Sequence, residues 1–364
     1  MSNKKIGIIT FHNAHNYGAV LQAYGLYRKL QLLGFESEFI QDANDTVGKK
    51  YSLYPSYKNK PLLSFCKSWL LLLADYKRKS KRSSAFNDFI ENYLPTYDLN
   101  RGCKSYSHVV LGSDQIWNFN ITSGIQNIYF GENENIRTES VFSYAASMGN
   151  GMEASNFTPS FKSKLEGLSA IGVREKSLSD EIKDNFDLES VVTLDPTLLL
   201  ENEEWNKLLS SKESTDNPYL LVYEVEKNSN TAAVVEYVKN KLGLEVKVIS
   251  SKIKAGESKS NITTASPREF LSLFKNASFV VTTSFHGTVF SLINEVPFFT
   301  IKFNSKVDLR SSGLLGSVEL CDRHIESIAD VDELTIDFTN AKENLSALRI
   351  KSETYLLNSL NEIS

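Results

Sequence analysis

The sequence predicts an α/β protein with two Rossmann-like domains and a cleft between them. Three observations lead to this fold class: the chain has 364 residues, apolar strand-like runs alternate with helix-like runs, and the alternation breaks once near the middle. A chain of this length exceeds what a single hydrophobic core usually organises. Alternating strands and helices form parallel sheets, because each helix returns the chain to the same sheet edge.

The first half opens with a βαβ unit. KIGIIT (5–10) is a buried β-branched strand, 18–33 carries apolar residues at helical spacing, and ESEFIQ (36–41) is a second strand. Four more strands and one helix are expected at 108–112, 141–147, 168–174 and 190–194, and at 176–185. Asp195–Pro196 ends this half, because proline cannot continue a central strand. We therefore expect the first domain at 1–195.

A second cycle starts at Pro218. Strands are expected at 219–223, 245–250, 279–282 and 298–301, and helices at 230–242, 266–274 and 287–294. The helix at 266–274 has a full start signal, with Ser266 as N-cap, Pro267 next and Glu269 as the third helical residue. Residues 341–360 form a terminal amphipathic helix. The second domain is therefore expected at 196–340, followed by a C-terminal helix at 341–364.

Composition excludes several classes of protein. The net charge of −4 argues against general nucleic-acid binding. Three widely spaced cysteines without a CxxC argue against a disulfide framework and a structural zinc site, and suit a reducing compartment. The apolar run at the N-terminus is too short for a signal peptide and lacks a cleavage site. A cytoplasmic protein is expected.

The turn in VVTTSFHG (280–287) predicts an anion site. A strand ends at Thr282, His286 lies in the turn, and a helix is expected from Gly287. The first amides of a helix lack partners within it and lie at the positive end of its dipole. His286 could act on such a ligand or only cap the helix. Lys306 follows the next strand, which returns it to the same edge, although a solvated loop lysine fits equally.

Two other loops follow strands at the edge where ligands gather in parallel sheets. Asn16 and Tyr17 lie at the first strand–helix junction, where they could bind a ligand or cap the backbone. Ser113, Asp114 and Gln115 form the loop of LGSDQIWN. Asp114 could contact substrate hydroxyls, serve as a base, or cap its own turn.

Several segments resemble, in the same order, motifs of the polysaccharide pyruvyl transferase family. Besides the turn with His286, they are IGIITFHNAHNYGAVL (6–21), LGSDQIWN (111–118), SYAASMG (143–149), VREKSLS (173–179), LDPTLLL (194–200) and VPFFTIKFNSKVD (296–308). The resemblance covers Lys5 to about Gly316. Two positions depart from it: Phe285 stands where the family often has a basic or aliphatic residue, and the first loop (12–16) lacks the family's frequent acidic pair.

The resemblance implies the fold of two-domain GT-B glycosyltransferases and a transfer of pyruvate from phosphoenolpyruvate to a sugar. The product is a ketal and phosphate is released. By matching position, Arg174, His286 and Lys306 would be the donor-binding and catalytic trio. The expected substrate-binding residues are Ser284, Gly287, Thr288, Asn16, Tyr17, Ser113, Asp114 and Gln115. The acceptor would be a sugar of a lipid-linked capsular or exopolysaccharide repeat-unit precursor.

These residue types suit the chemistry of phosphoenolpyruvate. Arginine matches a carboxylate with two parallel hydrogen bonds, lysine supplies a point charge, and a helix start binds phosphate. Histidine can carry a proton at neutral pH, so His286 would protonate the methylene carbon or the departing phosphate. Neither hydride chemistry nor a Lewis acid is required, and we expect no cofactor and no metal.

Residues 48–82 carry ten Lys or Arg and one acid, Asp75. Leu62–Leu73 (LLSFCKSWLLLL) is apolar but too short to span a bilayer. An apolar helix flanked by lysines is typical of a helix lying on an anionic leaflet, although a buried helix with a basic loop is the alternative. We expect peripheral contact with the inner membrane surface, where the basic run Lys77–Arg82 meets the lipid.

Two other functions fit the same pattern. A nucleotide-sugar-dependent GT-B glycosyltransferase would use the same helix start for a diphosphate and an acidic residue for ribose hydroxyls, for which Glu245 is the candidate. A non-enzymatic protein that binds a sugar or an anion would need neither a proton carrier nor a second substrate.

Overall fold

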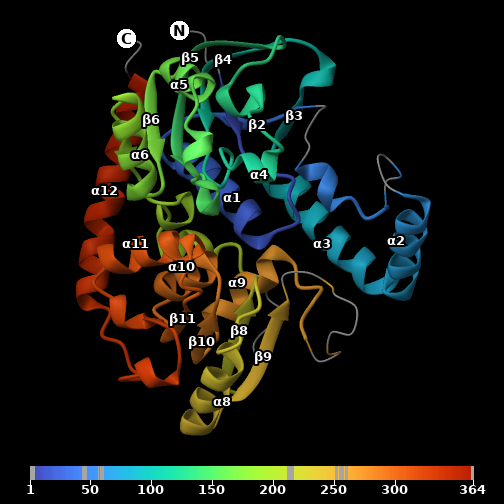
Figure 1. The fold of residues 1–364 in the computed structure, drawn as a ribbon, viewed down its shortest axis with the longest axis vertical. Helices are drawn as coiled ribbons and strands as arrows, with labels where there is room; N and C mark the ends of the chain where they lie inside the picture. Colours follow the sequence, from blue (N-terminus) through green and yellow to red (C-terminus); the bar gives the residue numbers. More distant parts are fainter. Residues whose placement is uncertain are drawn as a thin grey trace.

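The computed structural model describes residues 5–42, 47–55, 57, 61–210, 217–250, 253, 258 and 261–361. Each half of the chain forms one parallel sheet covered by helices (Figure 1). This confirms the predicted α/β fold class with two Rossmann-like halves. The strands fall within 6–192 and 219–325, inside the expected domains, while the domain limits themselves stay a prediction.

The first sheet has seven parallel strands in the order β3-β2-β1-β4-β5-β6-β7. They are β1 (Ile6–Ile9), β2 (Ser37–Gln41), β3 (Thr96–Asp98), β4 (Lys104–Leu111), β5 (Ile136–Ala146), β6 (Ala170–Val173) and β7 (Val191–Val192). The strand β1 is buried throughout, as expected for the centre of a sheet covered on both faces. The strand order reverses between β1 and β4, so a crevice opens beyond their carboxyl ends.

The helices of this half and of the connection are α1 (Tyr17–Leu32), α2 (Leu62–Ala74), α3 (Tyr76–Tyr93), α4 (Phe119–Thr122), α5 (Pro159–Glu166), α6 (Lys176–Phe186) and α7 (Asn202–Asn206). Helix α1 begins after Asn16, whose side chain accepts a hydrogen bond from the Ala19 amide. It ends before Gly34, whose φ of +87° suits a residue without a Cβ. Helices α3, α4, α5 and α7 were not expected from the sequence.

The second sheet has five parallel strands in the order β12-β11-β10-β8-β9. They are β8 (Tyr219–Glu224), β9 (Glu245–Ser250), β10 (Phe279–Thr282), β11 (Phe298–Ile301) and β12 (His324–Ile325), and the helices are α8 (Thr231–Leu242), α9 (Pro267–Lys275), α10 (Phe285–Ile293) and α11 (Leu309–Ser317). The capping box predicted for Ser266 and Glu269 is present at the start of α9. The strand order reverses between β8 and β10, which gives this half a crevice of its own.

The two halves pack directly against each other through α1, α3 and α9. The ring of Tyr17 stacks on Phe270 at a centroid distance of 4.4 Å, and its hydroxyl donates to the Ala265 carbonyl. Arg82 of α3 donates to Tyr17 Oη and to the Thr263 carbonyl at 3.0 Å each. One hydrophobic cluster therefore continues from the first half into the second.

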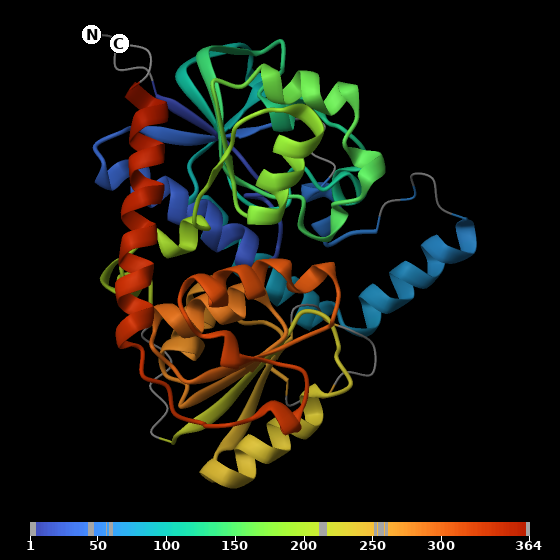
Figure 2. The ribbon, with the colours of Figure 1, turned by 60° about the vertical axis from the view of Figure 1, so that its left-hand side comes forward.

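The C-terminal helix α12 (Thr339–Asn361) runs along both halves (Figure 2). Near its start, Lys342 pairs with Glu295 of the second half at 3.1 Å. Near its end, the Tyr355 hydroxyl donates to the Ser143 carbonyl of β5 at 2.8 Å. The helix starts two residues before the expected 341, and its last expected residues, 362–364, lie outside the described residues.

Candidate active site

The two crevices face each other and enclose a cavity of about 110 Å³. The first half contributes Asn16, beyond β1, and Asp114 and Gln115, beyond β4. The second half contributes residues at and beyond the carboxyl ends of β8 and β10, among them Tyr223, Thr283, Ser284 and His286. The cavity therefore lies where the strand order of both sheets reverses, the usual ligand position in open parallel sheets. We call it the cleft cavity.

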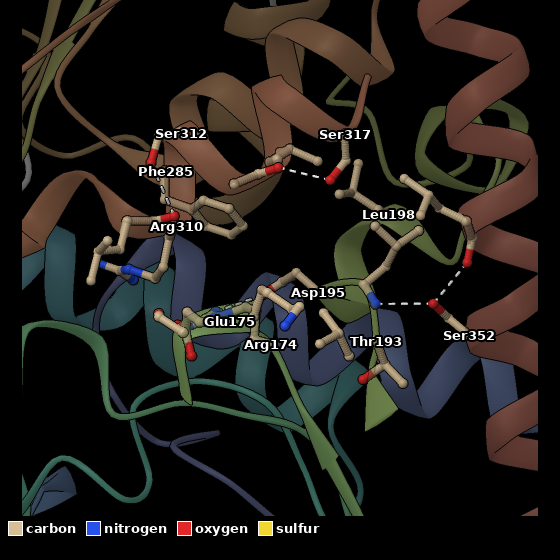
Figure 3. Close-up of a pocket in the computed structure, with 18 of the residues that line it drawn as sticks. Arg174, Glu175, Thr193, Asp195, Leu198, Phe285, Arg310, Ser312, Ser317 and Ser352 are labelled. Atoms are coloured by element: carbon tan, nitrogen blue, oxygen red, sulfur yellow. Dashed lines mark hydrogen bonds and ion pairs between the residues drawn. The ribbon is translucent and has the colours of Figure 1, made fainter. Parts of the chain in front are cut away.

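A second cavity of about 360 Å³ lies beside it, between α10, α11 and α12 (Figure 3). Its lining includes Arg174, Glu175, Asp195, Phe285 and Arg310. Phe285 and Arg310 also line the cleft cavity, so the two spaces share a wall. We call this second space the side cavity.

Helix α10 begins at Phe285, two residues earlier than the expected Gly287. Ser284 is the N-cap, because its backbone is extended (φ −110°, ψ 133°) while its carbonyl already accepts from the Thr288 amide at 3.0 Å. His286 therefore lies in the first turn of the helix and not before it. The amides of this first turn lack partners inside the helix and lie at the cleft cavity.

Gly287 allows that turn to sit tightly against the end of β10. A Cβ at this position would lie 2.2 Å from Thr282 Oγ1, closer than any side chain tolerates. Because Gly287 has no side chain, the first turn of α10 can pack closely against Thr282.

The imidazole of His286 is held between α1 and Asp195. Its Nε2 lies 3.7 Å from Asp195 Oδ2, which is an ion-pair distance once the ring is protonated. This nitrogen has no hydrogen-bond partner among the described residues. On the other side, a Cβ at Gly18 of α1 would lie 2.2 Å from His286 Nδ1. The ring therefore fills the space that Gly18 leaves.

Asp195 connects the groups of the site. Its Oδ2 accepts from Arg174 Nη1 at 2.7 Å and from Ser113 Oγ at 3.1 Å, and its Oδ1 accepts from the amide and hydroxyl of Thr197. Burial raises the pKa of Asp195, but His286, Arg174 and Thr197 outweigh burial and hold that pKa well below its usual 3.8. The carboxylate is therefore ionised at neutral pH.

Arg174 leaves β6 and is almost fully buried, with 3% of its side chain exposed. Besides Asp195, it contacts Glu175 Oε1 at 3.4 Å, and that carboxylate accepts from Ser147 Oγ. Burial lowers the pKa of Arg174, but the charges of Glu175 and Asp195 outweigh it and raise the pKa. Its Nη2 and Glu175 Oε2 are buried and lack a hydrogen-bond partner among the described residues.

Arg310 brings a second guanidinium to the site. The guanidinium carbons of Arg174 and Arg310 lie 5.2 and 5.6 Å from the centre of the Phe285 ring. Within the described part of the chain, Arg310 has neither a hydrogen bond nor an ion pair. Burial and the charge of Arg174 lower the pKa of Arg310, although a guanidinium stays protonated in proteins. Arg310 therefore brings to the site a guanidinium that no ion pair among the described residues engages.

Of the predicted trio, Arg174 and His286 meet through Asp195, whereas Lys306 does not join them. Lys306 lies in a short 3₁₀ turn, and its amine donates to the Met152 carbonyl of the first half. It is exposed and lines neither cavity. Four residues further along the chain, Arg310 occupies the position expected for the second cation.

Three of the other predicted residues have their polar groups engaged inside the protein. Tyr17 is packed between the halves, Ser113 donates to Asp195, and Thr288 Oγ1 contacts the Ser284 carbonyl and Thr300 Oγ1. Asn16, Asp114, Gln115 and Ser284 line the cleft cavity as side chains or backbone.

Sequence reasoning missed Asp195, Glu175, Phe285 and Arg310 as members of the site. Asp195 lay in LDPTLLL, where only its neighbour proline was interpreted. A second basic residue just beyond Lys306 was the available signal for Arg310. Among the described residues, no group of three His, Cys, Asp or Glu is arranged to hold a metal ion, and all three cysteines are free and exposed.

A family model described as polysaccharide pyruvyl transferase matches residues 16–305. A comparison with curated protein sequences finds no match. Among solved structures, a UDP-N-acetylglucosamine 2-epimerase is 12% identical with a TM-score of 0.50, covering 98% of this chain and 95% of that chain.

Two further structures are similar to the chain. The UDP-GlcNAc 2-epimerase from Neisseria meningitidis bound to UDP-GlcNAc is 11% identical, with a TM-score of 0.47. The match covers 98% of this chain and 94% of the epimerase. The wall teichoic acid polymerase TagF is 10% identical, with a TM-score of 0.46. The match covers 100% of this chain and 89% of the polymerase chain. At these identities the likeness concerns the fold, which is of the GT-B type.

Proposed function

The chain belongs to the polysaccharide pyruvyl transferase family, and we propose that it transfers pyruvate from phosphoenolpyruvate to a sugar of a capsular or exopolysaccharide precursor. One observation carries the proposal: the guanidinium of Arg310, which no ion pair engages among the described residues, meets that of Arg174 over Phe285 at the start of α10, beside the His286–Asp195 pair. Two cations and a helix start suit a small, highly charged anion, and the pair supplies a proton carrier.

In this proposal the cations bind the two charged groups of phosphoenolpyruvate. Arg174 offers its unpartnered Nη2, and Arg310 offers a whole guanidinium. Planar guanidinium groups form parallel hydrogen bonds with carboxylate and phosphate. The first amides of α10 complete the phosphate site, since they lie at the positive end of the helix dipole.

His286 then moves the proton. The protonated ring, stabilised by ionised Asp195, gives its proton to the methylene carbon, which makes the adjacent carbon cationic. A sugar hydroxyl attacks that carbon, and its proton returns to His286. The C–O bond to phosphate then breaks, the second sugar hydroxyl attacks the same carbon to close the ketal ring, and the proton of this hydroxyl leaves with the phosphate. Asp114, across the cleft cavity, is placed to accept hydrogen bonds from the acceptor hydroxyls.

The decisive experiment incubates the purified protein with phosphoenolpyruvate and candidate lipid-linked or water-soluble sugars. We expect phosphate release and a sugar whose mass rises by pyruvate less one water. Release of a nucleoside diphosphate from a nucleotide sugar, with no reaction of phosphoenolpyruvate, would support the glycosyltransferase alternative. Binding of either ligand without any product would support a binding protein.

The position of Glu245 argues against the nucleotide-sugar alternative. This residue, the candidate for ribose binding, is exposed at the amino end of β9. The cleft cavity lies beyond the carboxyl ends of the strands, at the opposite edge of the same parallel sheet.

Arg310→Gln is expected to raise the KM for phosphoenolpyruvate by about 10- to 150-fold, because a hydrogen bond to a charged group contributes about 1.5–3 kcal/mol. The variant Lys306→Gln is the matched comparison, since it removes a nearby cation that donates to a backbone carbonyl. Steady-state kinetics measures both. A larger KM effect in Lys306→Gln than in Arg310→Gln would assign the second cation to Lys306, as the sequence suggested.

Gly18→Ala is expected to lower kcat at least tenfold while the melting temperature changes little. The new Cβ would displace the end of the His286 side chain, whereas alanine itself favours the helix by about 1 kcal/mol. Gly316→Ala is the control, because its nearest neighbour is Cys321 Sγ at 3.9 Å. If Gly18→Ala kept the wild-type kcat, the close contact with His286 would have no bearing on the reaction.

A further inference from the structure

We propose that α2 and the start of α3 form a docking surface for an anionic membrane. The docking surface consists of exposed leucines and lysines: Leu62, Leu63, Leu70, Leu73, Lys67, Lys77 and Lys81. Figures 1 and 2 both show α2 projecting from the body of the protein at the end of α3. Binding to membrane is a property separate from catalysis and can be measured without substrate.

The apolar part of the docking surface is a continuous stripe on α2. Leu62, Leu63, Leu70 and Leu73 are 64%, 86%, 67% and 65% exposed and recur at helical spacing. Only Leu72 of this helix is buried. Proteins rarely leave such a stripe in water unless it binds something. No helix in the described ranges is long and apolar enough to cross a membrane. An exposed apolar stripe beside basic residues is typical of a helix that lies on the bilayer surface.

The positive charge of the docking surface favours an anionic membrane as its partner. Lys67, Lys77 and Lys81 are exposed, and within the described ranges none of them has an ion-pair partner. The single acid of the region, Asp75, already pairs with Arg78. An apolar stripe beside free lysines complements the anionic headgroups of a leaflet. A second copy of the chain would bring the same lysines together, and like charges disfavour that contact.

The structure corrects one part of the sequence-based expectation. Of the basic run 77–82, Arg82 is buried and joins the two halves through Tyr17 and Thr263, so it cannot face lipid. Lys58 and Lys60 of the basic stretch lie outside the described residues. Exposed aromatic rings extend the surface instead, since Tyr54 and Tyr76 are 55% and 43% exposed and tyrosines favour the membrane interface.

Two adjoining cavities form a groove between the docking surface and His15, which precedes Asn16 of the cleft cavity. A cavity of about 540 Å³ is lined by Leu72 of α2, Lys79 of α3 and Tyr51, and a neighbouring cavity of about 640 Å³ shares Tyr51 and His15 with it. Burial raises the pKa of Tyr51, and the negative charge of Asp114, which lines the cleft cavity, raises this pKa further. The groove would admit the sugar of a lipid-linked acceptor, a role that rests on the proposed function.

Co-sedimentation of the full chain with phosphatidylcholine vesicles, with and without phosphatidylglycerol, tests the docking surface. We expect binding to the anionic vesicles that weakens with added salt, and little binding to the neutral ones. The triple variant Lys67→Gln, Lys77→Gln, Lys81→Gln should bind about 100-fold more weakly, because each lysine contributes about fivefold. Leu63→Ser with Leu70→Ser should also lose binding.

The controls are leucine and isoleucine side chains exposed elsewhere. Leu242→Ser with Ile350→Ser removes two such residues, on α8 and α12, and should bind vesicles like the wild type. Wild-type protein that ignores anionic vesicles, or docking-surface variants that bind like the controls, would overturn the proposal. A dimer broken by the leucine variants in gel filtration, with vesicle binding unchanged, would identify a second copy as the partner and overturn it as well.

The failure of this proposal and of the proposed function can be told apart. Docking-surface variants should keep wild-type turnover on a water-soluble acceptor and lose it only with an acceptor embedded in vesicles. Vesicle binding without any pyruvyl transfer would leave the docking surface intact and refute the reaction alone.

Discussion

Replacing His286 by glutamine is expected to lower kcat for pyruvyl transfer by about 10²–10⁴-fold, the usual contribution of a positioned acid or base. Glutamine fills a similar volume in the space that Gly18 leaves but cannot carry a proton. The KM for phosphoenolpyruvate should change little, because Arg174 and Arg310 remain. Steady-state kinetics at saturating acceptor, with phosphate release as the signal, measures both constants.

His108→Gln is the matched control for this variant. His108 is also a buried histidine, but it lies on β4 and lines neither the cleft cavity nor the side cavity. Its replacement should leave kcat unchanged. Wild-type turnover by His286→Gln would exclude this residue as the proton carrier, and equal losses in both variants would point to a general defect in folding.

Asp195→Ala is expected to lower the free energy of unfolding by about 3–5 kcal/mol, because it leaves the buried Arg174 guanidinium without its strongest partner. Asp195→Asn keeps the shape and part of the hydrogen bonding to Thr197 and should lose less. Denaturation in guanidinium chloride, followed by tryptophan fluorescence and circular dichroism, gives both values.

Asp322→Ala is the control for the loss of an ion pair. Asp322 pairs with Arg323 at 2.6 Å but is half exposed, so its removal should cost about 1 kcal/mol or less. Equal losses in Asp195→Ala and Asp322→Ala would contradict the central role assigned to Asp195.

The pH dependence of stability gives a second measure of Asp195. Its pKa is lowered in the folded protein, so its stabilising effect is complete above the unfolded value of 3.8 and disappears as the pH falls below it. Between about pH 4 and pH 2, the wild type should lose stability more steeply than Asp195→Asn. Parallel curves for the two proteins would show that the carboxylate is not held ionised by its neighbours.

The parts of the fold set by local patterns could be predicted. The β-branched run of β1, the capping box at Ser266 and the turn before α10 are short-range signals, and the structure has all three. The two-residue difference at the start of α10 arises because Ser284, with an extended backbone, can serve as N-cap without a side-chain hydrogen bond.

The parts of the site set by tertiary packing could not be predicted. Arg310 lies near Arg174 only because α11 packs over the side cavity. The sequence of α11, LRSSGLLGS, has too little apolar periodicity to predict a helix. The only local signal beside Asp195 is Pro196, which indicates a chain break and says nothing about the role of the carboxylate. No local pattern indicates that Gly18 of α1 leaves room for a histidine far along the chain.

The attachment of α12 to both halves has a consequence for how substrates arrive. Its contacts through Lys342 and Tyr355 tie the second half to the first along one flank of the molecule. On the opposite flank, from which α3 and α2 project (Figure 1), Arg82 of α3 joins the halves through Tyr17 and Thr263. Because both flanks are tied, we expect substrates to reach the cleft without a wide separation of the two halves.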